Sequence, residues 1–245
     1  MEEKAYKLLA NQLDISGKRA KELIDRGLVY VGDKKLKIAR APMREDTKFR
    51  VELPAKIEKI YEDDNILAVN KPAFLDSYEV EAEFPQAKLI HRLDRETSGV
   101  LLLAKNEEFL QKAIEEFKNK KVIKRYVAWV EGVVYEELKI DAPIWSVKRA
   151  GKVISKIDFK RGKEALTIVK PNIVQGKKSK VDIEIKTGRT HQIRIHLAYV
   201  EHPIVGDEAY GSVTKAKRIL LHAKEIQLLG YSFVAPEPKD ILKYK

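Results

Sequence analysis

The sequence predicts an α+β fold, in which a large domain with a mixed, mostly antiparallel sheet follows a small α/β domain. Short aliphatic runs bounded by turn residues recur from residue 66 onward and indicate strands. Few segments between these runs show helical periodicity, which favours an antiparallel or mixed sheet. The first 54 residues differ, because two helical patterns there precede two strands. Pro54 and the charged stretch 55–59 indicate a linker, so we expect domains at residues 1–54 and 58–245.

Composition narrows the function classes. With 245 residues and a hydrophobic content of 44%, the chain can bury a sizeable core. It contains no cysteine, which excludes disulfides, thiolate zinc sites and cysteine nucleophiles. No apolar stretch reaches membrane-spanning length and no signal-peptide pattern is present, so we expect a cytoplasmic protein that contacts no membrane. Lys and Arg outnumber Asp and Glu by 48 to 37, and the net charge of +11 favours a polyanionic partner.

Two helices and two strands account for the first domain. Residues 3–13 place their leucines near helical spacing, and Ser16 is a good N-cap for a second helix that Gly27 closes. Strands follow at residues 28–31 and 49–53. The second helix carries four basic residues, namely Lys18, Arg19, Lys21 and Arg26. Such charges usually form no more than the solvated face of a helix.

Strands and two helices alternate through the large domain. The clearest helix covers residues 106–119, with an apolar stripe and Asn106 as its N-cap. The stretch 139–162 is rich in turn and basic residues, which is typical of a long loop or a hairpin. Thr190 is a candidate cap for a helix through Leu197, although the alternation of apolar residues there also suits a strand. The remaining aliphatic runs predict strands at residues 66–69, 100–104, 126–130, 164–170 and 179–186, and a further strand that begins at residue 220.

A dense cluster of ionisable residues stands directly before one of the predicted buried strands. Four of them, His91, Arg92, Asp94 and Arg95, fall within five positions. A solvated surface turn is the ordinary interpretation of such a cluster. Catalytic residues, however, are often found on loops that a rigid strand holds in place. One carboxylate between two arginines beside a hydrophobic wall therefore makes this loop a candidate site.

The first domain resembles the S-four-like RNA-binding module, which is named after a small-subunit ribosomal protein. The resemblance rests on Ser16-Gly17-Lys18-Arg19-Ala20, on Ile24-Asp25-Arg26-Gly27-Leu28-Val29-Tyr30-Val31-Gly32, and on the closing strand at Val51. In that module the basic second helix lies against an RNA backbone. The resemblance therefore implies RNA contacts for Lys18, Arg19, Lys21 and Arg26.

Residues 60–235 resemble the RluA-type pseudouridine synthases, which isomerise uridine to pseudouridine in RNA. The matching motifs are Asn70-Lys71-Pro72, His91-Arg92-Leu93-Asp94 with Thr97-Ser98-Gly99, Lys124-Arg125-Tyr126, Thr187-Gly188-Arg189-Thr190-His191-Gln192-Ile193-Arg194, His202-Pro203-Ile204-Val205-Gly206-Asp207 and Leu221-His222-Ala223. The sequence departs from the family after Pro72, where it has Ala73-Phe74-Leu75 and a short acidic span. The resemblance implies a pseudouridine-synthase fold for the large domain and an enzyme that uses neither a metal nor another cofactor.

The same resemblance assigns catalytic roles. Asp94 is the catalytic carboxylate and acts on the sugar as a nucleophile or as a base. Arg194 keeps this group ionised in an apolar pocket, and we expect the two side chains to pair bidentately. Tyr126 offers an aromatic face to the target base and a hydroxyl for proton transfer. The ordinary alternatives are a structural salt bridge for Arg194 and a half-buried strand tyrosine for Tyr126.

The same resemblance assigns substrate binding to four residues, Arg92, His91, Arg189 and Leu221. Arg92 fills the space of a flipped nucleotide or holds its phosphate. His91 contacts phosphate or braces the loop, and we prefer the bracing role. Leu221 lines the uracil pocket, although aliphatic residues are far more often part of a core.

Two further histidines, His191 and His196, lie five positions apart, and neither a cysteine nor a pair of carboxylates joins them. We therefore expect no metal site.

We expect an RNA pseudouridine synthase that acts as a monomer on large-subunit (23S) ribosomal RNA, because the first module occurs in family members that act there. Transfer RNA is the alternative target. A non-catalytic RNA-binding assembly factor is the alternative class, but such a protein has no need of Asp94, Tyr126 and Arg194 together. A glycoside hydrolase would need a second catalytic acid, and we discount it. The target uridine, and the choice between nucleophile and base, stay open at this point.

Overall fold

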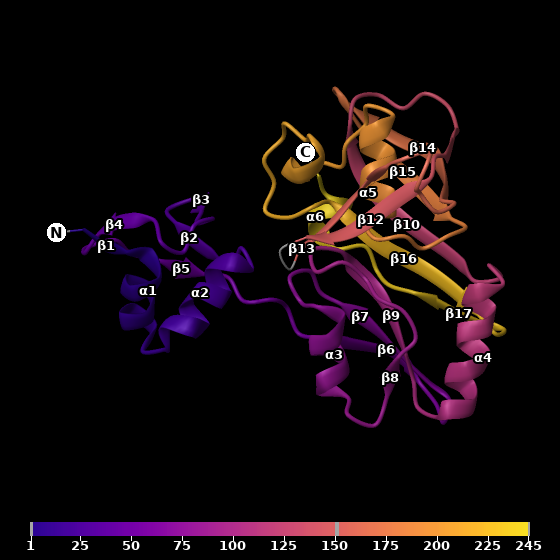
Figure 1. The fold of residues 1–245 in the computed structure, drawn as a ribbon, viewed down its shortest axis with the longest axis horizontal. Helices are drawn as coiled ribbons and strands as arrows, with labels where there is room; N and C mark the ends of the chain where they lie inside the picture. Colours follow the sequence, from indigo (N-terminus) through magenta and orange to yellow (C-terminus); the bar gives the residue numbers. More distant parts are fainter. Residues whose placement is uncertain (1, 150–151, 245) are drawn as a thin grey trace. The chain divides into compact units, whose positions relative to one another are not determined.

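The computed structural model describes residues 2–149 and 152–244. The chain divides into two compact units, Met1–Ala55 and Lys56–Lys245, which Figure 1 shows in indigo to violet and in magenta to yellow. No helix in the described part of the chain is long and apolar enough to cross a membrane.

The small unit packs two helices against short strands. Its elements are β1 (Glu2–Lys4), α1 (Ala5–Leu13), α2 (Gly17–Asp25), β2 (Val29–Val31), β3 (Lys34–Lys35), β4 (Pro42–Arg44) and β5 (Arg50–Val51). Strand β1 pairs with β4, and β2 pairs with both β3 and β5. The predicted ends of the second helix are confirmed, because Ser16 Oγ accepts a hydrogen bond from Arg19 N–H at 3.2 Å and Gly27 ends the helix with a φ of +72°.

The large unit is built on one sheet of ten strands in the order β11-β14-β15-β10-β16-β9-β7-β6, with β17 added beside β16 and β8 beside β9. Its first elements are β6 (Glu58–Glu62), β7 (Ile66–Lys71), α3 (Ser77–Glu83), β8 (Lys88–Leu89), β9 (Ser98–Ala104), α4 (Glu107–Lys118) and β10 (Ile123–Glu131). The others are β11 (Leu138–Asp141), β12 (Ile144–Arg149), β13 (Lys152–Ile157), β14 (Leu166–Gln175), β15 (Lys178–Ile185), α5 (Gln192–Tyr199), the 3₁₀ helix η1 (Glu208–Tyr210), β16 (Leu221–Leu228), β17 (Tyr231–Val234) and α6 (Lys239–Leu242). The expected mixed, mostly antiparallel sheet of an α+β fold is confirmed.

Strand β9 is buried along its whole length because helices cover both of its faces. Leu101 and Leu103 pack with Val80 of α3, whereas Val100 and Leu102 pack with Phe109 of α4. Figure 1 shows these two helices on either side of the strands β6 to β9. A strand that is covered on both faces has no polar alternation, which explains the continuous apolar run in the sequence.

The parallel pair of β9 and β16 requires a glycine. Ser98 stands opposite His222 and Gly99 opposite Ala223 in this pair. Gly99 has a φ of +120°, and a Cβ atom at this position would lie well inside van der Waals contact of the Ala223 carbonyl oxygen. Only glycine lets the two backbones approach this closely.

One helix begins later than predicted. The helix expected at Thr190 exists as α5, but its N-cap is His191, which has a left-handed backbone and makes no side-chain cap. The side chain of Gln192 ties down the preceding turn instead: its Oε1 accepts hydrogen bonds from Thr187 Oγ1 at 2.7 Å and from Arg189 N–H at 3.0 Å. The alternative of a strand through Leu197 is wrong.

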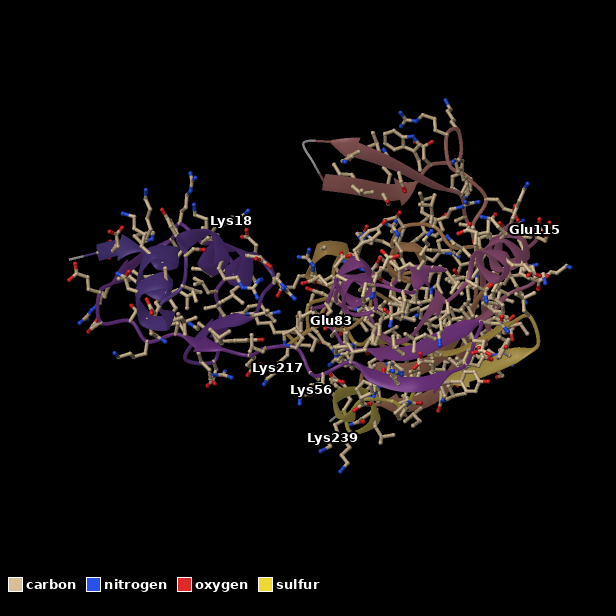
Figure 2. All side chains as sticks on the ribbon, turned by 90° about the horizontal axis from the view of Figure 1, so that it is seen from below. Lys18, Lys56, Glu83, Glu115, Lys217 and Lys239 are labelled. Carbon is tan, nitrogen blue, oxygen red and sulfur yellow. The ribbon has the colours of Figure 1, made fainter. Side chains whose placement is uncertain are left out.

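Two further predictions change in detail. The basic stretch 139–162 contains β11 and a hairpin of β12 and β13, whose tip residues 150–151 lie outside the described residues. In Figure 2 this hairpin projects from the rest of the large unit. The expected linker extends into β6, which begins at Glu58.

Helix α3 had no counterpart among the predicted elements. Its capping box, formed by Asp76 and Glu79, was a readable signal in the sequence.

Gly99→Ala should destabilise the large unit by more than about 2 kcal/mol, because the added Cβ forces β9 away from β16. The matched control is Gly188→Ala, since a Cβ at Gly188 would meet nothing within 4 Å and its φ lies outside the left-handed region. Urea unfolding curves of the two variants and the parent measure the effect. Equal stability of Gly99→Ala and the parent would show that the two strands do not depend on this approach.

Candidate active site

The loop that carries Asp94 is fixed on both sides of that residue. On one side, Leu93 N–H donates to Ser77 Oγ and the Ser77 hydroxyl donates to the Leu93 carbonyl, both at 3.0 Å. On the other side, the Arg95 carbonyl accepts hydrogen bonds from Phe74 N–H at 2.7 Å and from Lys71 Nζ at 3.2 Å. The neighbours of Asp94 are thus tied to α3 and to the end of β7, so the backbone position of Asp94 is set by tertiary contacts.

Lys71 is the buried centre of this arrangement, with no exposed surface. Its ammonium also donates to the Pro72 and Leu75 carbonyls, at 3.0 and 2.8 Å. Burial lowers the pKa of Lys71 to about 7, and the negative charges of Asp76 and Asp94 oppose this shift. In the sequence, Lys71 stood out only as part of a motif, and no role was predicted for it. A lysine at the end of a buried apolar strand was the available signal.

Two histidines brace the loop and the strand that follows it. His91 Nε2 accepts the Leu102 N–H at 3.2 Å, and its ring stacks on Phe117 at 5.7 Å between centroids. His222 Nδ1 is hydrogen-bonded to Ser98 Oγ at 2.9 Å. Burial lowers the pKa of each histidine to about 4, so both rings are neutral at pH 7. The contacts of His91 are those of the preferred bracing role.

Arg194, on α5, lies between two carboxylates. Its Nη1 is 3.6 Å from Asp94 Oδ2, whereas its Nε and Nη2 donate to Asp207 Oδ2 and Oδ1 at 2.6 and 2.9 Å. The expected bidentate pair with Asp94 is therefore wrong. The forked edge of the guanidinium faces the buried Asp207, and one remaining nitrogen faces Asp94. Burial alone would lower the pKa of Arg194, but its hydrogen bonds with Asp207 raise it.

Tyr126 stands at the junction of the two side-chain clusters that underlie α3 and α5. It is half-buried on β10, and its hydroxyl has no hydrogen-bond partner among the described residues. Burial, and then the negative charge of Asp94, raise the pKa of the phenol above its ordinary value. The side chain is therefore a neutral phenol at neutral pH.

His191 is a neighbour of Asp94 that was not among the predicted site residues. Its Nε2 lies 3.9 Å from Asp94 Oδ2, and its Nδ1 is hydrogen-bonded to Tyr210 OH at 2.9 Å. The Tyr210 ring also lies under the Arg194 guanidinium, 4.9 Å from its carbon. Nothing in the local sequence linked Tyr210 to this site, because it follows a separate loop.

The other predicted substrate-binding residues differ in exposure. Arg92 is exposed beside α3, where its Nη1 donates to Tyr78 OH at 3.3 Å. Arg189 Nε donates to the Glu164 carbonyl at 3.0 Å. Leu221 is 3% exposed and belongs to the cluster under α5, so it contributes to the core. His196 is fully buried and hydrogen-bonded through both ring nitrogens.

The four basic residues predicted to lie on the second helix do not share one surface. Lys18 and Arg19 are exposed, and Figure 2 shows the Lys18 side chain projecting from the small unit. Lys21 is half-buried with its ammonium over the Tyr6 ring, 4.2 Å from the centroid. Arg26 is buried at 8% exposure and lies 3.3 Å from Glu22, so it is not part of the exposed basic face.

Comparisons with known proteins agree on one activity. The family described as RNA pseudouridylate synthase matches residues 65–199, which include β10, α5 and the loop of Asp94. An "Uncharacterized RNA pseudouridine synthase" of Helicobacter pylori (strain J99) is 50% identical over 97% of this chain and 98% of its own length. "Ribosomal large subunit pseudouridine synthase D" of Pasteurella multocida is 30% identical over 81% of this chain and 69% of its own length. The solved structure "Human RNA Pseudouridylate Synthase Domain Containing 1" superposes with a TM-score of 0.64 at 27% identity, over 76% of this chain and 86% of that chain.

Stability should fall as the buried His222 is protonated. Its folded-state pKa of about 4 lies below the ordinary 6.5, so the unfolded chain takes up the proton first as the pH falls. The contribution of the neutral His222 ring to the free energy of unfolding is present in full above pH 6.5 and is lost as the pH falls toward about 4. In a His222→Asn variant, which keeps a polar partner for Ser98, the parent's stability advantage should shrink by about 1–3 kcal/mol between pH 7 and pH 4.5. Urea unfolding at both pH values measures it, and an advantage that does not change with pH would contradict a neutral buried ring.

Proposed function

Because the chain belongs to the RNA pseudouridylate synthase family and is an isomerase of uridine in RNA, we propose that Asp94 is its catalytic group. The observation that carries this proposal is the position of the Asp94 carboxylate, which is held on a clamped loop 3.6 Å from an arginine that Asp207 fixes in turn. A carboxylate on a rigid loop beside a fixed positive charge is prepared for the reaction before the substrate arrives, which suits a reactive oxygen.

The reaction needs one such oxygen at the sugar. Pseudouridine forms when the bond between C1′ and N1 of uridine breaks, the uracil turns, and C5 of the ring bonds to C1′. The hydrogen on C5 is lost as a proton and N1 gains one, so the reaction is an isomerisation. A carboxylate serves either as a nucleophile at the sugar or as a base in this sequence. Asp94 in the proposed role supplies the oxygen for both versions.

Tyr126 and Arg194 complete the proposed catalytic group. Tyr126 brings an aromatic face and a neutral hydroxyl close to the charge of Asp94, and these suit stacking on the base and proton transfer. Arg194 stabilises the ionised carboxylate from the other side. Its fork on Asp207 leaves it little freedom, so the charge it presents to Asp94 has a fixed direction.

We also propose how RNA reaches this group. Arg92 is exposed two residues before Asp94, where its long side chain suits the space of a flipped nucleotide or its phosphate. Arg189, on the turn before α5, suits a second phosphate contact. His91 and Leu221 would support the substrate-binding residues from the core side. The small unit would act as an S-four-like RNA-binding domain through the exposed Lys18 and Arg19 of α2.

The proposed substrate is large-subunit ribosomal RNA. Relatives called large subunit pseudouridine synthase C and D support this target, at 36% identity in Buchnera aphidicola and 30% in Pasteurella multocida. The net charge of +11 suits a large folded polyanion. The particular uridine depends on RNA shape and on contacts that lie outside the catalytic loop.

Asp94→Asn should abolish pseudouridine formation and leave RNA affinity within about twofold, because the change removes a charge and keeps the shape. In cells that lack the gene, the parent should restore pseudouridines in large-subunit ribosomal RNA, and Asp94→Asn should restore none. Chemical mapping of pseudouridine in ribosomal and transfer RNA measures both. The matched control is Asp64→Asn, an exposed aspartate on the turn before β7, which should behave as the parent.

Two outcomes of this mapping would contradict the proposal separately. Restored pseudouridine with Asp94→Asn would remove Asp94 from the chemistry. Restoration by the parent in transfer RNA alone would keep the catalytic group and replace the ribosomal target.

The proposed role of the small unit predicts an effect on RNA affinity and none on the chemical step. Replacing Lys18 and Arg19 together by Ala should weaken RNA binding and leave kcat at saturating RNA unchanged, because these residues would touch phosphates and belong to a different unit from Asp94. The slope of log affinity against log salt should become shallower by about one for each lost phosphate contact. The control pair is Lys34→Ala with Lys48→Ala, which removes equal charge from exposed positions outside α2. Equal losses in both pairs would argue against a specific role of α2.

A further inference from the structure

The backbone of His191 is held in an unfavourable conformation at the start of α5. Its φ and ψ are 56° and 24°, in the left-handed region that side-chain-bearing residues seldom adopt. The His191 carbonyl nevertheless accepts the Ile195 N–H at 2.9 Å, so this residue begins the helix. Strain of this kind persists where the surrounding structure over-determines it, and such positions cluster at functional sites.

The imidazole of His191 connects two side chains from separate elements. On one edge, Nδ1 is hydrogen-bonded to Tyr210 OH of η1 at 2.9 Å. On the other edge, Nε2 faces Asp94 Oδ2 at 3.9 Å. The ring therefore stands between a phenol that fixes its orientation and the carboxylate proposed to react.

The proton positions follow from the surroundings of the two rings. Burial raises the pKa of Tyr210 and lowers the pKa of His191, so at neutral pH the phenol keeps its proton and the imidazole carries only one. The charged groups that face His191 are Asp94, Arg194 and Asp207. If the Tyr210 hydroxyl donates to Nδ1, the single ring proton must lie on Nε2, where it points toward Asp94.

Two donors then converge on the same oxygen of Asp94. Arg194 Nη1 lies 3.6 Å and His191 Nε2 lies 3.9 Å from Oδ2. No hydrogen bond of the described residues is made to the Asp94 carboxylate itself, so its closest polar neighbours are these two nitrogens. Both contacts are longer than a hydrogen bond, so they place an arginine nitrogen and an imidazole nitrogen within reach of the carboxylate without yet fixing its rotation.

We propose that Tyr210 and His191 form a second positioning device for Asp94: Tyr210 sets the tautomer of His191, and His191 directs a neutral N–H to the Asp94 carboxylate and so orients it for reaction at the sugar. This inference rests on the proposed catalytic role of Asp94. In the complex with substrate, this contact of 3.9 Å would tighten to a hydrogen bond. A neutral donor orients the carboxylate and avoids the deeper ground state that a second cation beside Asp94 would create.

Steady-state kinetics of Tyr210→Phe test this device, because the change removes the hydroxyl and keeps the ring under Arg194. We expect kcat to fall about five- to tenfold, as for one lost orienting hydrogen bond, with KM for RNA unchanged. His191→Gln, which keeps a neutral donor, should retain more activity than His191→Ala. Adding Tyr210→Phe to His191→Gln should cause no further loss, since the hydroxyl acts only through the imidazole. Tyr199→Phe, at an exposed position of α5, is the matched control and should behave as the parent.

A spectroscopic measurement tests the same idea without activity. In the ¹⁵N-labelled parent, histidine side-chain correlation spectra should show His191 as a single neutral tautomer with its proton on Nε2, assigned by its disappearance in His191→Gln. In Tyr210→Phe the ring should become a mixture of tautomers. A proton on Nδ1 in the parent would overturn the proposal, and so would normal kcat in both Tyr210→Phe and His191→Ala.

Failure of this inference and failure of the proposed function give different results. If Asp94→Asn is inactive while Tyr210→Phe and His191→Ala are fully active, Asp94 remains catalytic and the positioning device is wrong. If Asp94→Asn is active, the proposed catalytic group itself is wrong, whatever the histidine variants do. Additive losses in the double variant would show that Tyr210 acts on Arg194 or on folding and not through His191.

Discussion

The close approach of β9 and β16 at Gly99 and Ala223 is the constraint on which the large unit depends. In the sheet order, β9 stands between two groups of strands. On one side lie β7 and β6, and on the other lie β16, β10, β15, β14 and β11. The loop of Asp94 leads directly into β9, so its place relative to α5 follows from this junction. The buried hydrogen bond between Ser98 and His222 closes the same pair one residue earlier. Backbone contact here substitutes for side-chain packing, which leaves no tolerance for a larger residue than glycine.

Three charged side chains form a chain of contacts, and their exposure increases from Asp207 through Arg194 to Asp94. Asp207 is almost fully buried and takes the fork of Arg194, and Arg194 presents a remaining nitrogen to the partly exposed Asp94. Removing Arg194 would leave the buried Asp207 carboxylate without its partner, which is costly in a low-dielectric environment. The bidentate hydrogen bonds hold the arginine, and the weaker contact is made with the carboxylate proposed to react. A carboxylate that acts as a nucleophile or as a base benefits from such a loose partner, because tight pairing would stabilise its resting state.

The polar groups beneath the loop explain how a charged segment stays in one place beside an apolar wall. Lys71 donates to three carbonyls and Ser77 both donates and accepts at Leu93, so the buried polar atoms around Asp94 are matched. Fully satisfied networks of this kind rigidify a segment, whereas half-satisfied ones destabilise it. A catalytic carboxylate gains from rigidity because its orientation is then prepared before the substrate arrives.

The sequence by itself determined the elements whose causes are local. The apolar run of β9, the caps at Ser16 and Asn106, and the family motifs around Asp94 could all be read directly, because each depends on residues within a few positions. Only the tertiary structure decided which carboxylate takes the fork of Arg194, that Arg26 is buried, and that Tyr210 reaches His191. These contacts join residues on separate loops and helices, so they are fixed by how β9, β16 and α5 pack together. Periodicity and capping signals carry no information about these long-range contacts, because the energies that decide them arise only when the elements have packed together.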